Sequence, residues 1–282
     1  MLKRLQKLRL CVIIILGDIM SNFAFEYSVG EDISKSVFRL HNHDDYEIYM
    51  FIEGDSNYVV EGRSYSLQPY DMIVIRRHEM HRVYHRSNAP YSRFVIMVKP
   101  EFFDEHACRV YERQFKETHS DAGNKITADV VRSSGLYDAY MRLKKYSCEF
   151  TVTHDPVVQS IIVEILYLID KVTLFAHDDS SNKQLADVIN YINSHYTEDL
   201  YLEDIASRFF ISKYHLCHLF KETTGLTMHT YINRKRITRV RELVADGSNI
   251  TNAVVNAGFN NYSSFYRAYV KVFGVSPGKN LR

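Results

Sequence analysis

Polar and apolar residues alternate with a period of two between Phe23 and about Pro100, and turn signals such as Glu53-Gly54-Asp55 separate the runs. This alternation is typical of strands with one buried face. The expected strands cover residues 47–52, 56–60, 63–67, 72–75 and 93–98. Several short strands at this spacing indicate a sandwich or a barrel.

The period becomes helical from Glu101 onward, and the clearest case follows Pro156, which suits the start of a helix. Apolar residues then recur at steps of three and four, which predicts a strongly apolar helix. These positions are Val158, Ile161, Ile162, Ile165, Leu168, Ile169 and Val172. Such a helix packs on the β domain or forms half of a dimer interface, and ordinary core packing explains most of the pattern.

Residues 202–282 contain two copies of one pattern, a short helix, a tight turn and a second helix. The first copy covers 202–209 and 212–221, and the second runs from Ile250 through Gly258 to Arg267. A helix over about 184–195 precedes them, and a connecting helix over about 228–246 joins them. Ser212 is placed to cap a helix, while Gly225 and Gly247 fall where helices should stop. This layout is typical of a DNA-binding domain.

A DNA-reading helix buries one face and exposes the other to bases and phosphates. In the first copy, Leu216, Leu219 and Phe220 should pack on Ile205, Ala206 and Phe209. The residues left exposed there are Lys213, Tyr214, Cys217, His218 and Lys221. In the second copy Phe259, Phe265 and Tyr269 should face inward. The outward residues include Tyr262, Ser263, Tyr266, Arg267 and Lys271.

The charge is divided unevenly along a chain whose formal net charge is only +1. Residues 181–282 contain 13 Lys and Arg and 8 Asp and Glu, so their net charge is +5. The net charge of residues 1–180 is −4. Basic charge therefore lies on the expected DNA-binding part, as phosphate binding requires. The 4 cysteines form no CxxC pair, so neither a zinc finger nor a disulfide framework is indicated. Free thiols in a reducing cytoplasm are the default.

Residues 1–22 form an expected tail that lies outside the fold. Basic residues precede the apolar run Leu10–Leu16, as in a signal peptide. That run is too short for a bilayer, which needs about 20 residues, and no small-residue cleavage site follows it. We expect a frayed tail or translation from Met20, a cytoplasmic protein and no membrane partner.

The last hundred residues resemble the DNA-binding domain of AraC-type transcription regulators. The resemblance rests on Ser212 to Gly225, on Tyr231-Ile232 with Arg236, and above all on Gly258-Phe259 followed by Gly274-Val275-Ser276-Pro277. It implies two helix-turn-helix units that enter successive major-groove segments on one face of DNA. It places Tyr214, Cys217, His218, Tyr262, Ser263, Tyr266 and Arg267 at base-contact positions, and makes Arg236 structural or phosphate-facing.

The chain departs from the family pattern in places. Ala253-Val254 stands where Ile-Ala is frequent, and Val240 replaces a usual alanine. Position 218 carries a histidine instead of an arginine, and histidine donates to guanine more weakly than a bidentate arginine does. Arg267 is then nearly the sole guanine-reading arginine, so modest affinity per chain is expected.

A second group of residues, His41, His43, Glu47 and His81 with Gly54, resembles the metal-binding motifs of cupin barrels. Lys35, Tyr70 and Arg77 depart from those motifs. Imidazoles two residues apart on a strand point the same way, and a carboxylate with a third imidazole can close a site. Three alternatives stay open for these residues: a divalent metal site, an effector pocket without metal, or a structural network. Tyr46, Tyr49, Tyr58, Tyr65 and Tyr84 would suit stacking on a sugar or ordinary strand packing.

These observations predict two domains. Residues 23–176 form a cupin-like β-barrel with following helices that senses an effector and dimerises, 177–183 form a linker, and 184–282 form an all-α DNA-binding domain with two helix-turn-helix units. The chain is then a sequence-specific DNA-binding transcription regulator and not an enzyme. Its expected partners are double-stranded DNA, a small-molecule effector with a sugar as one candidate, RNA polymerase and a second copy of the chain. The alternative is a cupin metalloenzyme fused to a helical domain.

Overall fold

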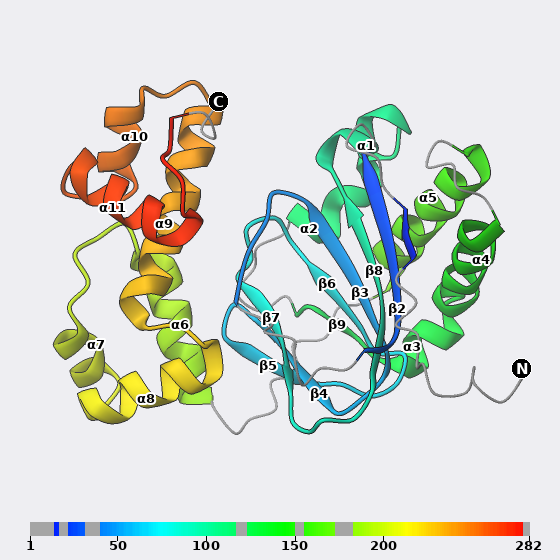
Figure 1. Cartoon of the computed structure of the whole chain (residues 1–282), viewed down its shortest axis with the longest axis horizontal. Coiled ribbons are helices and arrows are strands. Elements are labelled where there is room, and N and C mark those ends of the chain that lie inside the picture. The colour runs from blue at the N-terminus through cyan, green and yellow to red at the C-terminus, as the bar shows by residue number, and fades with distance from the viewer. Residues whose placement is uncertain are drawn as a thin grey trace, which may run out of the picture. The chain divides into compact units, whose positions relative to one another are not determined.

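The structure is a computed structural model that describes residues 14–16, 22–31, 40–116, 123–149, 155–172 and 183–278. The chain divides into two compact units, residues 1–179 and 180–282 (Figure 1). Most of the expected tail and linker therefore lies outside the described residues, apart from β1 (Ile14–Leu16), Asn22 and Lys183.

The first unit is built on two antiparallel sheets. The larger sheet has the strand order β1-β2-β8-β3-β6-β9, and the smaller has the order β5-β4-β7. Their bounds are β2 (Phe23–Glu31), β3 (Tyr46–Glu53), β4 (Ser56–Val60), β5 (Arg63–Ser66), β6 (Met72–Ile75), β7 (His81–His85), β8 (Tyr91–Val98) and β9 (Lys125–Ile126). The five expected strands are all present, two of them with the expected bounds. The structure adds four strands that the sequence did not predict, β1, β2, β7 and β9. Of these, β1 lies within residues 1–22, which were expected to lie outside the fold, and it pairs with β2.

Among the described residues, no strand pairing joins the two sheets into a closed barrel. The smaller sheet ends at β7, whose outer edge meets only an isolated bridge between His41 and His81. One aromatic core holds the inner faces of the sheets together. It consists of Tyr49, Phe51, Tyr58, Val60, Tyr65, Leu67, Ile73, Ile75, Val83 and Tyr91. The first unit is therefore a two-sheet structure with a core between the sheets.

The outer face of the larger sheet is covered by helices, which makes its central strand β3 buried on both faces. The helical segments are α1 (Pro100–Glu105), η2 (Arg109–Glu112), α2 (Arg113–Lys116), α3 (Ala128–Ser133), α4 (Leu136–Glu149) and α5 (Pro156–Lys171). In α5, Asp155 caps the first turn and the expected apolar positions are buried or partly buried in this core. Core packing on the sheet accounts for them, and a dimer role of α5 stays a prediction.

The second unit contains only helices among its described residues. They are α6 (Lys183–His195), α7 (Leu202–Arg208), α8 (Lys213–Thr224), α9 (Met228–Ala245), α10 (Ile250–Asn256) and α11 (Tyr262–Phe273). The Ser212 hydroxyl accepts from the His215 amide at 3.2 Å, and Gly225 ends α8 in the left-handed conformation. The same pair of devices bounds α11, with Asn261 at its start and Gly274 at its end. Both helix-turn-helix units are thus present as predicted.

The loop after α6 contacts both the connecting helix α9 and the turn of the second helix-turn-helix unit. Arg236 of α9 donates to the backbone oxygens of Tyr196 and Glu198, each at 2.6 Å. Gly258, in the turn of the second unit, has a φ of +92°, and a Cβ there would lie 2.5 Å from the Thr197 oxygen. Arg236 is therefore structural, one of the two roles expected for it.

Candidate effector cavity and nucleic-acid interface

A cavity of about 260 Å³ lies between the two sheets of the first unit. Its wall is mainly apolar, with polar groups gathered at separate places. The lining residues are Ala24, Phe25, Glu26, His41, His43, Glu47, Tyr49, Tyr58, Val83, Tyr91, Arg93, Val95 and Met97. Three of the four predicted effector residues line it, and the fourth, His81, is buried beside them.

The cavity wall comes from strands that are far apart in sequence. Glu47 and Tyr49 alternate on β3, while Arg93, Val95 and Met97 alternate on β8, which pairs with β3. Because side chains on a strand alternate between its faces, these residues share the inner face of the sheet. Tyr58 reaches the same space from the opposite sheet.

Glu47 lies at the centre of the polar residues. Its Oε2 is 3.0 Å from His43 Nε2 and 3.3 Å from His81 Nε2, and its Oε1 accepts from the Tyr58 hydroxyl at 2.9 Å. Burial by itself would raise the pKa of the Glu47 carboxyl, but the charges and hydrogen bonds of His81 and His43 outweigh it and hold that pKa well below its usual range. Burial likewise acts to lower the pKa of His81, and the Glu47 carboxylate overcomes it and raises that pKa.

The cavity has more polar lining residues than the sequence predicted, and only two of the five candidate tyrosines line it. Tyr49 and Tyr58 line the cavity, whereas Tyr46 donates to Glu112, Tyr65 donates to Asn124, and Tyr84 is 48% exposed. The missed lining residues are Glu26, Tyr91 and Arg93. Arg93 donates to Glu26 at 2.8 Å and its guanidinium lies 5.2 Å from the centre of the Tyr91 ring. The alternation of residues 91–98 could have placed Arg93 on the same face as Val95 and Met97.

The first recognition helix, α8, has the two faces that the sequence predicted. Leu216 and Phe220 are fully buried, and Leu219 is half-buried. The exposed residues are Lys213, Tyr214, Cys217, His218 and Lys221. Tyr214 is 83% exposed, and its ring lies parallel to that of His218 at 6.4 Å. Lys213 pairs with Glu203 of α7, and His218 lies 3.2 Å from Glu222.

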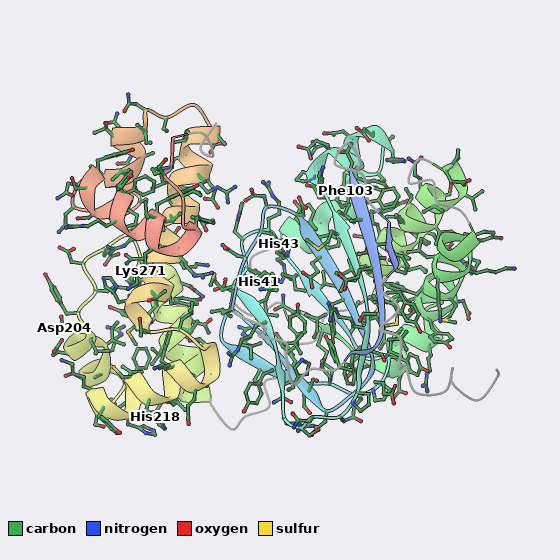
Figure 2. All side chains as sticks on the ribbon, in the orientation of Figure 1. His41, His43, Phe103, Asp204, His218 and Lys271 are labelled. Carbon is green, nitrogen blue, oxygen red and sulfur yellow. The ribbon has the colours of Figure 1, made fainter. Side chains whose placement is uncertain are left out.

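The second recognition helix, α11, is organised in the same way. Phe265 and Tyr269 are buried in a core with Phe259. Its exposed residues include Tyr262, Ser263, Tyr266, Arg267 and Lys271. Figure 2 labels His218 of α8 and Lys271 of α11, one residue from each exposed face. All ten predicted DNA-contact residues are therefore accessible.

A groove of about 340 Å³ lies between α9 and α11 in the second unit. Its lining residues are His229, Asn233, Arg236, Phe259, Asn260, Ser264, Arg267, Ala268 and Lys271, with no carboxylate among them. His229 and Asn233 were not among the residues predicted from the sequence. Their spacing with Arg236 by four and three residues places all three on one face of α9, and this signal could have found them.

The chain matches two family models. One is described as an AraC-like ligand binding domain and covers residues 29–167, and the other is described as a helix-turn-helix domain and covers residues 205–282. A relative called HTH-type transcriptional activator RhaS, from Klebsiella pneumoniae (strain 342), is 23% identical over 247 residues, which are 87% of this chain and 88% of the relative.

Two further similarities cover different lengths of the chain. Regulatory protein PocR from Salmonella typhimurium (strain LT2) is 33% identical over 102 residues, 36% of this chain and 32% of that protein. The crystal structure of ToxT from Vibrio cholerae O395 is 15% identical with a TM-score of 0.35, and the match covers 92% of this chain and 97% of that chain.

A β-sheet domain with an internal cavity, followed by two helix-turn-helix units, defines a ligand-binding DNA-binding regulator. The chain belongs to the AraC family of transcription regulators and carries an AraC-like ligand-binding domain. This family consists of transcription regulators, so the alternative of a metalloenzyme fused to a helical tail is set aside. Across the described residues, no helix combines the length and the apolar composition needed to cross a bilayer.

Proposed function

We propose that the cavity of the first unit binds the effector and that its polar residues recognise it. The observation that carries this proposal is the position of Glu47, a buried carboxylate held by His43 and Tyr58 in the wall of a mainly apolar cavity. A pocket of this kind suits a small polar molecule, because the apolar wall supplies affinity and the few polar groups supply orientation. The effector residues are His41, His43, Glu47 and His81, and a sugar is one candidate.

The proposed DNA-reading residues are the exposed ones of α8 and α11. Tyr214, Cys217 and His218 face bases from the first helix, while Tyr262, Ser263, Tyr266 and Arg267 do so from the second. Lys213, Lys221 and Lys271 supply phosphate contacts. Arg267 is the one arginine among these positions, and a bidentate contact to guanine is the commonest specific contact of that side chain.

The groove between α9 and α11 extends this face, because Arg267 and Lys271 belong to both. The groove is lined by hydrogen-bond donors, and no Asp or Glu in its lining would repel or replace an anion. Such a lining suits a phosphate of the DNA backbone. His229 and Asn233 are therefore proposed as backbone contacts between the two recognition helices.

Effector binding alters DNA binding or activation only if the effector favours one arrangement of the protein over another. A homodimer formed through the first unit would link two DNA-binding events and raise the affinity for DNA without new contacts. Relatives called transcriptional activators favour activation through RNA polymerase as the output. The proposed location is the cytoplasm.

The test is a genome-wide map of binding sites, followed by titration of full-length protein with the DNA sites found. Effectors are screened by thermal shift with a panel of sugars and other small polar molecules, and a hit should change the affinity for DNA. His43→Gln should abolish that change while leaving effector-free DNA affinity within twofold, because His43 lies in the first unit. His106→Gln, a change in the same unit outside the cavity lining, serves as control. An effector response that survives His43→Gln would remove these histidines from the proposed effector site.

A further inference from the structure

The cavity of the first unit contains a second group of polar side chains, away from Glu47. Arg93 Nη2 donates to Glu26 Oε1 at 2.8 Å, and both half-buried side chains line the cavity. The Arg93 guanidinium also lies 5.2 Å from the centre of the Tyr91 ring. Ser28 lies directly opposite Arg93 in the strand register, and its buried hydroxyl makes no hydrogen bond to the described residues. An ion pair with one donating and one accepting partner is therefore part of the cavity wall.

The register of the larger sheet separates this ion pair from Glu47. Glu47 pairs with Met97 on β8, whereas Arg93 pairs with Phe51, which lies four residues further along β3. At about 3.3 Å per residue, these two backbone positions are about 13 Å apart along the strand. Between them, Val95 lines the cavity with an apolar side chain. The cavity thus has polar groups towards two ends and a mainly apolar wall between them.

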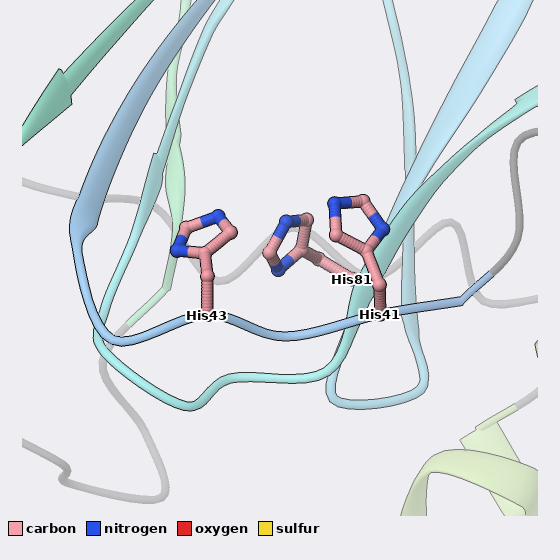
Figure 3. Close-up of side chains that lie close together, drawn as sticks. All are labelled: His41, His43 and His81. Atoms are coloured by element: carbon pink, nitrogen blue, oxygen red, sulfur yellow. The ribbon is translucent and has the colours of Figure 1, made fainter. Parts of the chain in front are cut away.

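The other polar end is formed by Glu47 and the histidines. Figure 3 shows the rings of His41, His43 and His81 rising to the same side from two neighbouring chain segments. Glu47 Oε2 lies 3.0 Å from His43 Nε2, and Glu47 Oε1 accepts from the Tyr58 hydroxyl at 2.9 Å. Each end of the cavity therefore holds a carboxylate beside nitrogen or oxygen groups that can donate hydrogen bonds.

This pairing restricts the charge that a bound molecule can carry. An anionic effector would have to displace Glu26 from Arg93, and it would add a third carboxylate to a wall that already contains Glu26 and Glu47. A cationic effector would have to take one of these carboxylates from its present partner and leave that partner without its counter-ion. Both cases bury a charge without compensation beside an apolar wall, which is costly.

A hydroxyl group avoids this cost. It has one hydrogen to donate and two lone pairs that accept, so it can donate to a carboxylate and accept from a guanidinium at the same time. It can therefore join the Glu26–Arg93 pair without separating the two charges.

We propose that Glu26 and Arg93 form a second effector subsite, and that the cavity selects an uncharged molecule with hydroxyl groups at both of its ends. One hydroxyl donates to Glu26 and accepts from Arg93, and another contacts Glu47. The apolar wall covers the carbon skeleton between them. This inference rests on the proposed function, because it names the chemical class of effector for the same cavity. It excludes carboxylic acids and amines, which the proposed function by itself leaves open.

Matched ligands that differ in charge test the proposal on the full-length protein. The panel consists of aldopentoses, aldohexoses, deoxyhexoses and sugar alcohols, each beside its acid and amine derivatives. Binding is detected by thermal shift and quantified by calorimetry. At least one neutral member should bind, and its acid and amine derivatives should bind at least tenfold more weakly. The proposal is wrong if no neutral member binds, or if a charged derivative binds as tightly as its neutral parent.

Glu26→Gln separates recognition from a merely structural role. The change should weaken binding of the neutral ligand at least tenfold. It should also strengthen binding of the matching acid at least tenfold, because the Glu26 carboxylate no longer competes for Arg93. Arg93→Gln should weaken the neutral ligand without this gain for the acid. A Glu26→Gln variant that keeps the preference of the parent protein would overturn the subsite.

Asp55→Asn is the matched control, because Asp55 pairs with Arg86 at 2.7 Å in the same unit but outside the cavity lining. It should change neither affinity nor preference, and an effect equal to that of Glu26→Gln would contradict a local role of Glu26. Circular dichroism checks that each variant is folded.

The outcomes also separate this proposal from the proposed function. A ligand whose binding depends on His43 but on neither Glu26 nor Arg93 would leave the cavity as the effector site and overturn the second subsite alone. A ligand that alters DNA binding and is unaffected by His43→Gln, Glu26→Gln and Arg93→Gln would overturn both.

Discussion

At the scale of single residues, two positions in the second unit adopt the left-handed backbone conformation, one with glycine, which tolerates it, and one with phenylalanine, which does not. Gly258 has a φ of +92° and lies against the backbone of Thr197, so both its conformation and its missing side chain are required. Phe210 has a φ of +55° and is 96% exposed in the turn before α8. An aromatic residue in this conformation is strained, and its ring gains little from packing.

Gly258→Ala should lower the free energy of unfolding by about 2–4 kcal/mol, the sum of left-handed strain and an overpacked contact. Urea unfolding of the full chain, followed by a signal of the second unit such as amide exchange, measures it. Gly274→Ala is the matched control, because Gly274 has a φ of +73° but no atom within 4 Å of its added Cβ. Equal losses in the two variants would show that the contact with Thr197 contributes nothing.

Phe210→Asn should raise the free energy of unfolding by about 0.5–1 kcal/mol, because asparagine tolerates the left-handed conformation better than phenylalanine. Phe210→Ala keeps most of the strain and removes only an exposed ring, so it should change stability little. The same unfolding measurement compares the two variants. A destabilised asparagine variant would mean that the Phe210 ring makes a stabilising contact that its exposure does not suggest.

At the scale of elements, α8, α9 and α11 divide the proposed DNA contacts into two kinds. The exposed faces of α8 and α11 carry groups that can reach base edges. The groove between α9 and α11 carries donors suited to phosphate. Base contacts determine which sequence is preferred, whereas phosphate contacts determine how binding depends on salt.

Arg267→Ala should weaken binding to the specific site by about 1–3 kcal/mol and relax the preference at one base pair. The double change His229→Ala with Asn233→Ala should instead weaken binding to all sequences by a similar factor. Fluorescence anisotropy on specific and scrambled duplexes at several salt concentrations separates the two effects. Arg267 is not a base-reading residue if its variant keeps both the affinity and the sequence preference of the parent protein.

At the scale of the whole molecule, each unit is compact in itself, and the second unit has its two helix-turn-helix motifs fixed through the loop 196–198. If α8 and α11 are held in a fixed relative orientation, they can enter only major-groove segments that lie on the same face of DNA, and each helix binds its own segment. Successive major-groove segments on one face lie about 34 Å apart, so one chain should cover about two turns.

Hydroxyl-radical footprinting should therefore show two protected segments about one helical turn apart for each bound chain. Because α8 and α11 carry different residues, the two segments should differ in sequence. Inserting five base pairs between the segments should abolish specific binding, since it rotates one of them to the opposite face. Retained affinity after that insertion would contradict a fixed arrangement of the two motifs.

Local sequence determined the helical unit almost completely. The start of α8 is set by Ser212, its end by Gly225, and its buried face by the spacing of Leu216 and Phe220. Each of these signals depends only on residues nearby in the sequence. Only the tertiary structure decided the composition of the cavity, because Glu26, Tyr91 and Arg93 join Glu47 through the register of strands distant in sequence. It also divided the strands of the first unit between two sheets, and it placed Thr197 against Gly258. Caps and periodicity are local properties, whereas register and close backbone approach depend on how distant segments pack.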